Sequence, residues 1–140
     1  MWVVYAFLSA ITAALVAIFG KLGLKNIDST LATTIRSIIM AGFLVIVSFF
    51  LNKWHDFSMR SLSSKDWLLI VLAGVAGALS WLFYFLALKT GLATKVVVIG
   101  RLSLVFVIIL AAIFLGEALS WKVALGAVLM IAGAIIITLK

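Results

Sequence analysis

The sequence has no cysteine and no proline, one histidine, and only four acidic residues among its 140. Without cysteine there are no disulfides, no thiolate chemistry and no cysteine-ligated metal site. One histidine and four acids supply neither a metal-ligand cluster nor a catalytic triad. We therefore expect no enzymatic activity, no metal and no cofactor.

What the sequence has in abundance is apolar residues: 67% are hydrophobic, 11% are charged, and the mean hydropathy is +1.42. Average soluble domains have roughly 45–50% apolar and about 25% charged residues. A soluble fold of this length could not bury so much apolar surface, so we expect an integral membrane protein. The net charge of +7 could suggest a nucleic-acid partner. However, the basic residues lie between or at the ends of apolar runs, which is typical of membrane topology signals and lipid headgroup contacts.

Five apolar runs are long enough to cross a bilayer, which takes about 20 residues in a helix. Backbone groups in lipid must be hydrogen-bonded within their own segment, so each run is expected to be α-helical. The predicted fold is a single all-α domain over residues 1–140, a bundle of five transmembrane helices. The expected helices are residues 2–22, 30–51, 67–88, 96–115 and 121–139.

Short polar segments mark the helix ends. Asp28 or Ser29 is suited to cap the second helix, since both are favoured at N-caps, and the alternative for Asp28 is an ion pair with Lys21 or Lys25. Ser120 could cap the fifth helix. The connection of residues 52–66 is the one polar enough to lie in water, and its Trp54, Phe57 and Met59 suggest that it lies along the interface.

With no proline, close helix contacts must depend on glycine. Small residues at helical spacing let helices approach closely. The simpler expectation is packing within the chain, and the alternative is a dimer interface. Such residues share one face of the third helix and one face of the fifth: Gly74, Ala78 and Trp81, and Gly126, Met130 and Gly133.

The basic residues give little orientation bias. One side of the membrane would carry Lys53, Arg60, Lys65 and Lys122, and the other Lys21, Lys25, Lys89, Lys95 and Lys140. The positive-inside rule needs a clear asymmetry to fix one orientation. The pattern favours dual topology, with two copies forming an antiparallel homodimer that reproduces an inverted repeat. The alternative is a single orientation with the C-terminus in the cytoplasm.

Arg36 and Arg101 are the two charges inside the predicted spans, each about six residues from one end and therefore roughly 9 Å deep. They could snorkel to the headgroups. Alternatively they face an interior site, because Thr33, Arg36, Ser37 and Met40 share a helix face. With Lys21, Lys89 and Lys95 at its mouth, such a site would favour anionic or zwitterionic solutes.

Aromatic residues cluster in the third helix at Trp81, Phe83, Tyr84 and Phe85. Packing or lipid contact would explain most of them. Trp81 and Tyr84 are three residues apart and carry polar atoms that need partners, so they are candidates to line a solute site. No acid lies inside any predicted span, which argues against a membrane-embedded carboxylate that exchanges protons.

Several short motifs follow one another along the chain: Lys21 to Ser29, Ala32-Thr33, Arg36, Ser80-Trp81, Tyr84, Ala87-Leu88-Lys89, Gly91, Lys95-Val96, Leu102-Ser103, Phe114-Leu115-Gly116-Glu117, Gly126 and Gly133. In their order and spacing, these motifs resemble the five-helix, EamA-like branch of the drug/metabolite transporter superfamily. The resemblance covers essentially the whole chain and implies a small-molecule permease of a prokaryotic inner membrane, related to ten-helix transporters with two inverted halves. The candidate substrate-binding residues are then Thr33, Arg36, Trp81, Tyr84, Arg101 and Ser103.

The sequence departs from the family pattern at the start of the fourth helix. The family tends to have Lys-Val-x-Pro-Ile-Asp-Lys-Leu-Ser there, and this chain has Val98 in place of the proline and Gly100 in place of the acid. The alternative function is therefore a non-transporting structural or accessory membrane protein. Such a protein could be a subunit that helps move a lipid-linked sugar, or a stabilised or inactive variant of a transporter.

Overall fold

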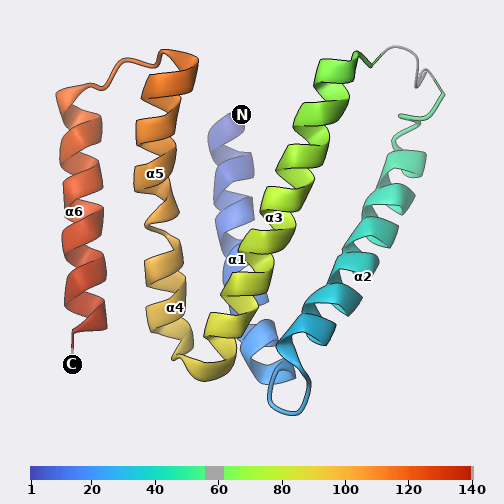
Figure 1. Cartoon of the computed structure of the whole chain (residues 1–140), viewed down its shortest axis with the longest axis horizontal. Helices are drawn as coiled ribbons and strands as arrows, with labels where there is room; N and C mark the ends of the chain where they lie inside the picture. Colours follow the sequence, from blue (N-terminus) through green and yellow to red (C-terminus); the bar gives the residue numbers. More distant parts are fainter. Residues whose placement is uncertain (56–61, 140) are drawn as a thin grey trace. The chain divides into compact units, whose positions relative to one another are not determined.

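The computed structural model describes residues 1–55 and 62–139. In this part of the chain, five helices are long and apolar enough to cross a membrane, so the all-α prediction is confirmed. Their ends differ from the predicted ends by a few residues. The five spans are α1 (Trp2–Gly23), α2 (Ser29–Phe50), α3 (Ser64–Thr90), Ala93–Leu115 and α6 (Trp121–Thr138) (Figure 1).

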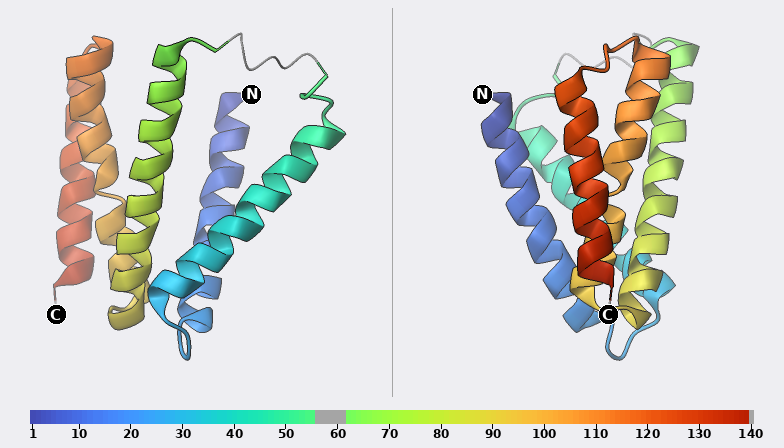
Figure 2. Two further views of the ribbon diagram at one scale, coloured as in Figure 1. Left: turned by 45° about the vertical axis from the view of Figure 1, so that its right-hand side comes forward. Right: turned by 90° about the vertical axis from the view of Figure 1, so that its left-hand side faces the viewer.

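The chain forms two compact units, one of residues 19–89 and one of residues 1–18 with 90–140. In the unit of residues 19–89, the start of α2 lies beside the end of α3, and the two helices separate toward their other ends (Figures 1 and 2). The last turn of α1 packs against the end of α3 at Gly20. A Cβ added to Gly20 would lie 3.2 Å from both Leu88 Cδ2 and Phe85 Cζ. Leu88 and Phe85 are buried, so they form the core of this unit.

Asp28 caps α2, as its residue type predicted. Its Oδ1 accepts hydrogen bonds from the backbone N–H groups of Thr30, at 2.9 Å, and Leu31, at 3.1 Å. These are two of the N–H groups that a helix start leaves without partners. The hydrogen bond from Leu31 is the largest reason that the pKa of the exposed Asp28 carboxyl lies below its ordinary value.

In the unit of residues 1–18 and 90–140, α6 lies beside the fourth span (Figure 2). Ser120 caps α6, since its hydroxyl accepts a hydrogen bond from Val123 N–H at 3.3 Å. The fourth span was expected to be one continuous helix from 96 to 115. It exists as a span but consists of three pieces: α4 (Ala93–Gly100), α5 (Ser103–Leu110) and the π-helix η2 (Ala111–Leu115).

The break between α4 and α5 is a local tightening of the helix. The N–H of Arg101 is shared between the carbonyls of Val97 and Val98, at 3.0 and 3.1 Å. The next N–H, of Leu102, donates to the carbonyl three residues back, at 3.0 Å. Hydrogen bonds of this shorter spacing have poorer geometry than those of an α-helix. Gly100, which stands immediately before the break, lowers the cost of leaving the helix there.

The fourth span ends at Gly116, as the sequence predicted. Gly116 has φ +67°, a left-handed conformation that glycine adopts without the steric cost of a Cβ. Beyond it, Glu117 N–H donates to Ala111 C=O at 3.3 Å. This bond closes the end of the π-helix, and the chain then turns toward α6.

The glycine faces of α3 and α6 make no close contacts inside their own units. A Cβ added at Gly74, Gly126 or Gly133 would have no heavy atom of the described residues within 4 Å. Neither unit therefore has close helix contacts at these glycines inside it, and the alternative of a dimer interface stays a prediction. Close helix packing occurs at Gly20 instead, because the side chains of Leu88 and Phe85 fill the space beside it.

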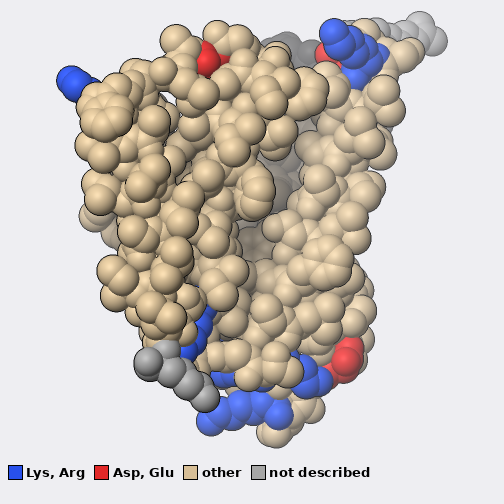
Figure 3. All heavy atoms as spheres, turned by 60° about the vertical axis from the view of Figure 1, so that its left-hand side comes forward, with Lys and Arg blue, Asp and Glu red and all other residues tan. Residues whose placement is uncertain are grey.

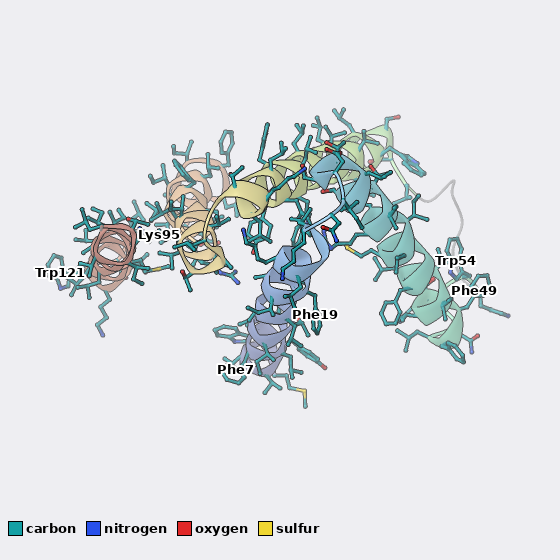
Figure 4. The ribbon with its side chains drawn as sticks, turned by 90° about the horizontal axis from the view of Figure 1, so that it is seen from below. Phe7, Phe19, Phe49, Trp54, Lys95 and Trp121 are labelled. Atoms are coloured by element: carbon teal, nitrogen blue, oxygen red, sulfur yellow. The ribbon has the colours of Figure 1, made fainter. Side chains whose placement is uncertain are left out.

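Charged side chains on the face shown in Figure 3 lie toward the ends of the helices, and the surface between them is uncharged. This is the distribution that a bilayer requires. Trp54, just beyond the end of α2, donates its Nε1–H to Ser48 Oγ at 2.6 Å and stacks on Phe49, with ring centroids 5.8 Å apart (Figure 4). Phe57 and Met59, also expected at the interface, lie outside the described residues.

Candidate functional site

Arg36 lies against an aromatic surface formed by α3. The Cζ atom of its guanidinium is 3.7 Å from the centroid of the Trp81 ring and 5.2 Å from that of Phe85. A guanidinium at such distances is attracted by the negative face of each ring. Arg36 is half-buried, and its Nη1 is buried without a hydrogen-bond partner among the described residues.

The contact between Arg36 and Trp81 is surrounded by further aromatic rings of α3, those of Tyr84 and Phe85. Trp81 meets Tyr84 edge to face, with centroids 5.5 Å apart, and Phe85 at 6.0 Å. Tyr84 and Phe85 are 5.9 Å apart. We refer to Arg36, Trp81, Tyr84 and Phe85 as the Arg36 cluster. Edge-to-face contacts of this kind hold each ring in place, so the indole that covers Arg36 is fixed by its neighbours.

The hydroxyl groups beside Arg36 on α2 donate within their own helix. Thr33 is buried and donates to Ser29 C=O at 2.7 Å, and Ser37 donates to Thr33 C=O at 2.8 Å. Thr33 and Arg36 share a face as the spacing predicted, and this face is turned toward the unit's interior at Thr33. The two hydroxyl protons are engaged, so they are not free to bind an anion.

Two lysines expected at the mouth of the site donate instead to helix ends. Lys21 Nζ lies 2.6 Å from Leu88 C=O and 3.3 Å from Lys89 C=O, in the last turn of α3. In the other unit, Lys95 of α4 donates to Thr138 C=O at 2.9 Å, at the end of α6 (Figure 4). The ends of helices carry carbonyls without helical partners and a partial negative charge, which a lysine ammonium stabilises.

Arg101 and Ser103 belong to the unit of residues 1–18 and 90–140. Arg101 is exposed at the break between α4 and α5, and Ser103 begins α5 and is also exposed. The structure therefore places Arg36, Trp81 and Tyr84 in one cluster and Thr33 one turn from it. A role in substrate binding stays a prediction for each of these residues.

Phe85 is the member of the cluster that the sequence did not single out. It is 3% exposed, whereas Phe83, two residues earlier on the same helix, is 64% exposed. The spacing of Phe85 could have predicted its place in the cluster. Residues four apart lie on the same helix face, and Phe85 is four residues after Trp81. The helix-capping role of Lys21 left no comparable signal, because its partner lies 67 residues away.

The chemistry available to the Arg36 cluster is that of anion binding. A guanidinium covered on one face by an indole keeps its in-plane N–H groups for an acceptor. Among the described residues, no group of three or more His, Cys, Asp or Glu side chains could hold a metal ion. The arrangement is that of a small polar contact in apolar surroundings, which is typical of solute sites.

Comparison with known proteins concerns the chain as a whole and not the Arg36 cluster. The EamA-like transporter family matches residues 1–139. A Sinorhizobium sp protein described as "uncharacterized transporter in cobO 3'region" is 38% identical over 136 residues, which covers 97% of this chain and 95% of the relative. No solved structure matches the chain.

Proposed function

Because this chain belongs to the EamA-like transporter family, and is a multi-pass membrane protein with a transporter role, we propose that it is a small-molecule permease of a prokaryotic cytoplasmic membrane. It moves an anionic or zwitterionic solute by alternating access. The observation that carries the proposal is the guanidinium of Arg36, held against Trp81 with a buried Nη1 that has no acceptor among the described residues. A buried polar group of this kind is costly unless something pairs with it.

The functional form in this proposal is an antiparallel homodimer. Five helices correspond to half of an inverted-repeat transporter, and two opposed copies would complete it. The nearly balanced basic residues support dual insertion. Among the described residues of their own units, Gly74, Gly126 and Gly133 have no atom within 4 Å of an added Cβ, so these helix faces suit a second copy.

Transport by purified protein in liposomes tests the proposal. The solutes are labelled amino acids, nucleotide precursors, sugar phosphates and organic monocarboxylates. We expect saturable uptake of at least one anionic or zwitterionic solute, and loss of that uptake in Arg36→Ala and Trp81→Leu. Phe83→Leu is the matched control, since Phe83 is exposed on the same helix and lies outside the Arg36 cluster.

Folding of each variant is checked by size-exclusion chromatography and circular dichroism. Uptake that is unchanged in both Arg36→Ala and Trp81→Leu would contradict the assignment of the site. Folded wild-type protein that neither binds nor moves any solute of the panel would contradict the permease function itself. That outcome would favour the accessory membrane protein, whose altered fourth span has Val98 and Gly100 in place of the family's proline and acid.

A further inference from the structure

The acids at the starts of α2 and α3 lie away from the Arg36 cluster along these helices. Asp28 caps α2 eight residues before Arg36, about 12 Å along the helix axis. Asp66 lies in the first turn of α3, 15 residues and roughly 22 Å before Trp81. Asp56 and Glu117 lie outside the predicted spans in the sequence. No acid of the sequence thus lies within one turn of Arg36 on α2 or of Trp81 and Phe85 on α3.

The geometry of the cluster restricts how an acceptor can reach Arg36. Trp81 covers one face of the guanidinium at 3.7 Å, which is close to van der Waals contact. Acceptors therefore approach the edge of the group, where the N–H bonds lie in its plane. Nη1, one of the two terminal nitrogens on that edge, is buried and has no partner among the described residues.

We propose, resting on the permease function above, that the solute is an organic monocarboxylate without an ammonium group. Its carboxylate pairs with the edge of Arg36, and its apolar body lies against the rings of Trp81, Tyr84 and Phe85. A carboxylate is flat and accepts two parallel hydrogen bonds from a guanidinium, so it fits a group whose face is covered. One carboxylate also neutralises one arginine.

Charge balance separates this solute class from two others. A phosphate monoester carries a charge of about −1.5 to −2 at neutral pH and would leave net negative charge beside apolar rings. An amino acid would bring an ammonium into a region where the sequence places no carboxylate to pair with it. The phosphate monoester and the amino acid would each place an unpaired charge in apolar surroundings. The free energy of burying that charge should weaken their binding by about tenfold or more.

The test is calorimetric binding to the purified full-length protein in nanodiscs, with four probes that share a phenyl body. These probes are 3-phenylpropionate, phenylalanine, phenyl phosphate and phenethylamine. We expect 3-phenylpropionate to bind most tightly, phenylalanine and phenyl phosphate to bind at least about tenfold more weakly, and phenethylamine not to bind.

Variants then test the two proposed contacts, that of the carboxylate with Arg36 and that of the apolar body with Trp81. Arg36→Ala should abolish binding of 3-phenylpropionate, and Arg36→Lys should weaken it, because an ammonium keeps the charge but loses the planar fork. Trp81→Leu should weaken binding, whereas Trp81→Phe should largely restore it, because a phenyl ring retains a cation–π face. Phe83→Leu, outside the cluster, should bind like the wild type. A purely structural role of Trp81 would not distinguish phenyl from an aliphatic side chain in this way.

Comparison of the probes on the wild-type protein does not depend on the folding of any variant. Equal binding of phenylalanine and 3-phenylpropionate would overturn the monocarboxylate inference and leave the permease intact. Tighter binding of phenyl phosphate, or transport of some other solute with no binding of 3-phenylpropionate, would overturn it in the same way. If the protein transports no solute at all and binds none of the probes, the proposed function fails as well.

Discussion

At the residue scale, Gly20 sets how closely the last turn of α1 approaches the end of α3. A side chain at this position would meet the buried side chains of Leu88 and Phe85, which leave little room to move. A Cβ added at Gly74, in the middle of α3, would in contrast meet no heavy atom of the described residues of its unit within 4 Å. The two glycines therefore differ in the cost of acquiring a side chain, although both are helical.

We expect Gly20→Val to lower the free energy of unfolding by about 1–3 kcal/mol, the usual cost of overpacking a well-filled site. Gly74→Val is the matched control and should be neutral or slightly stabilising, since valine has a higher helix propensity than glycine. Thermal unfolding of both variants in the same detergent measures the difference. A Gly74→Val variant that loses as much stability as Gly20→Val would contradict this account.

Asp28 makes a pH-dependent contribution to the stability of α2. The pKa of its carboxyl is lowered in the folded chain, mainly by the hydrogen bond from Leu31 N–H. The stabilisation is therefore fully present above the pKa of the unfolded carboxyl, about 3.9, and is lost as the pH falls through the lower folded value. Asp28→Ala should have a lower melting temperature than the wild type from about pH 5 to about pH 8, where the carboxylate is charged. The difference between the two melting temperatures should shrink below about pH 4. A difference that is constant over this range would show that the carboxylate charge has no part in the cap.

At the scale of elements, the spans could be predicted and the break in the fourth span could not. Hydropathy and length determine where α1, α2, α3 and α6 lie, because lipid requires long apolar helices. The run of residues 96–115 is as apolar as the others, and its only mark of a break is Gly100. The shift to shorter hydrogen bonds at Leu102 depends on backbone geometry that hydropathy does not encode.

The Arg36 cluster could be predicted only in part, because one of its contacts joins two helices. Helical spacing placed Thr33 with Arg36, and Trp81 with Tyr84, because each pair lies on one helix. The contact of Arg36 with Trp81 joins residues on different helices and depends on how α2 and α3 pack. Sequence spacing contains no information on that packing.

The break predicts faster amide hydrogen exchange in the fourth span than in α6 of the same unit. The N–H groups of Leu102, Leu104 and Val105 make hydrogen bonds to carbonyls three residues back. We expect these amides to exchange about tenfold faster or more than those in the middle of α6, since local opening costs less where bonds are poorly aligned. Gly100→Ala should slow their exchange, because alanine favours the helix by about 1 kcal/mol. Uniform protection along residues 93–115 would contradict the break.

At the scale of the whole molecule, the proposed dual topology predicts that each connection between spans lies on both sides of the membrane. The absence of cysteine makes the test direct, because single cysteines can be introduced without removing any native ones. We expect Asn26→Cys and Ala118→Cys, in connections at opposite ends of the spans, each to react in part with an impermeant maleimide applied to intact cells. Permeabilised cells provide the value for full labelling. Complete labelling at one site and none at the other would establish a single orientation.

The hydrogen bonds of Lys21 to the end of α3 have a consequence for biosynthesis. Lys21 and Leu88 are separated by 67 residues, so their bond cannot form until most of this unit has been synthesised. Until then the ammonium is solvated at the end of α1 and counts among the charges that orient the first helix. Once α3 has been inserted, the same ammonium stabilises the carbonyls at its end. Lys21 therefore has two successive roles. It first contributes to the orientation of the nascent α1, and it later stabilises the end of α3.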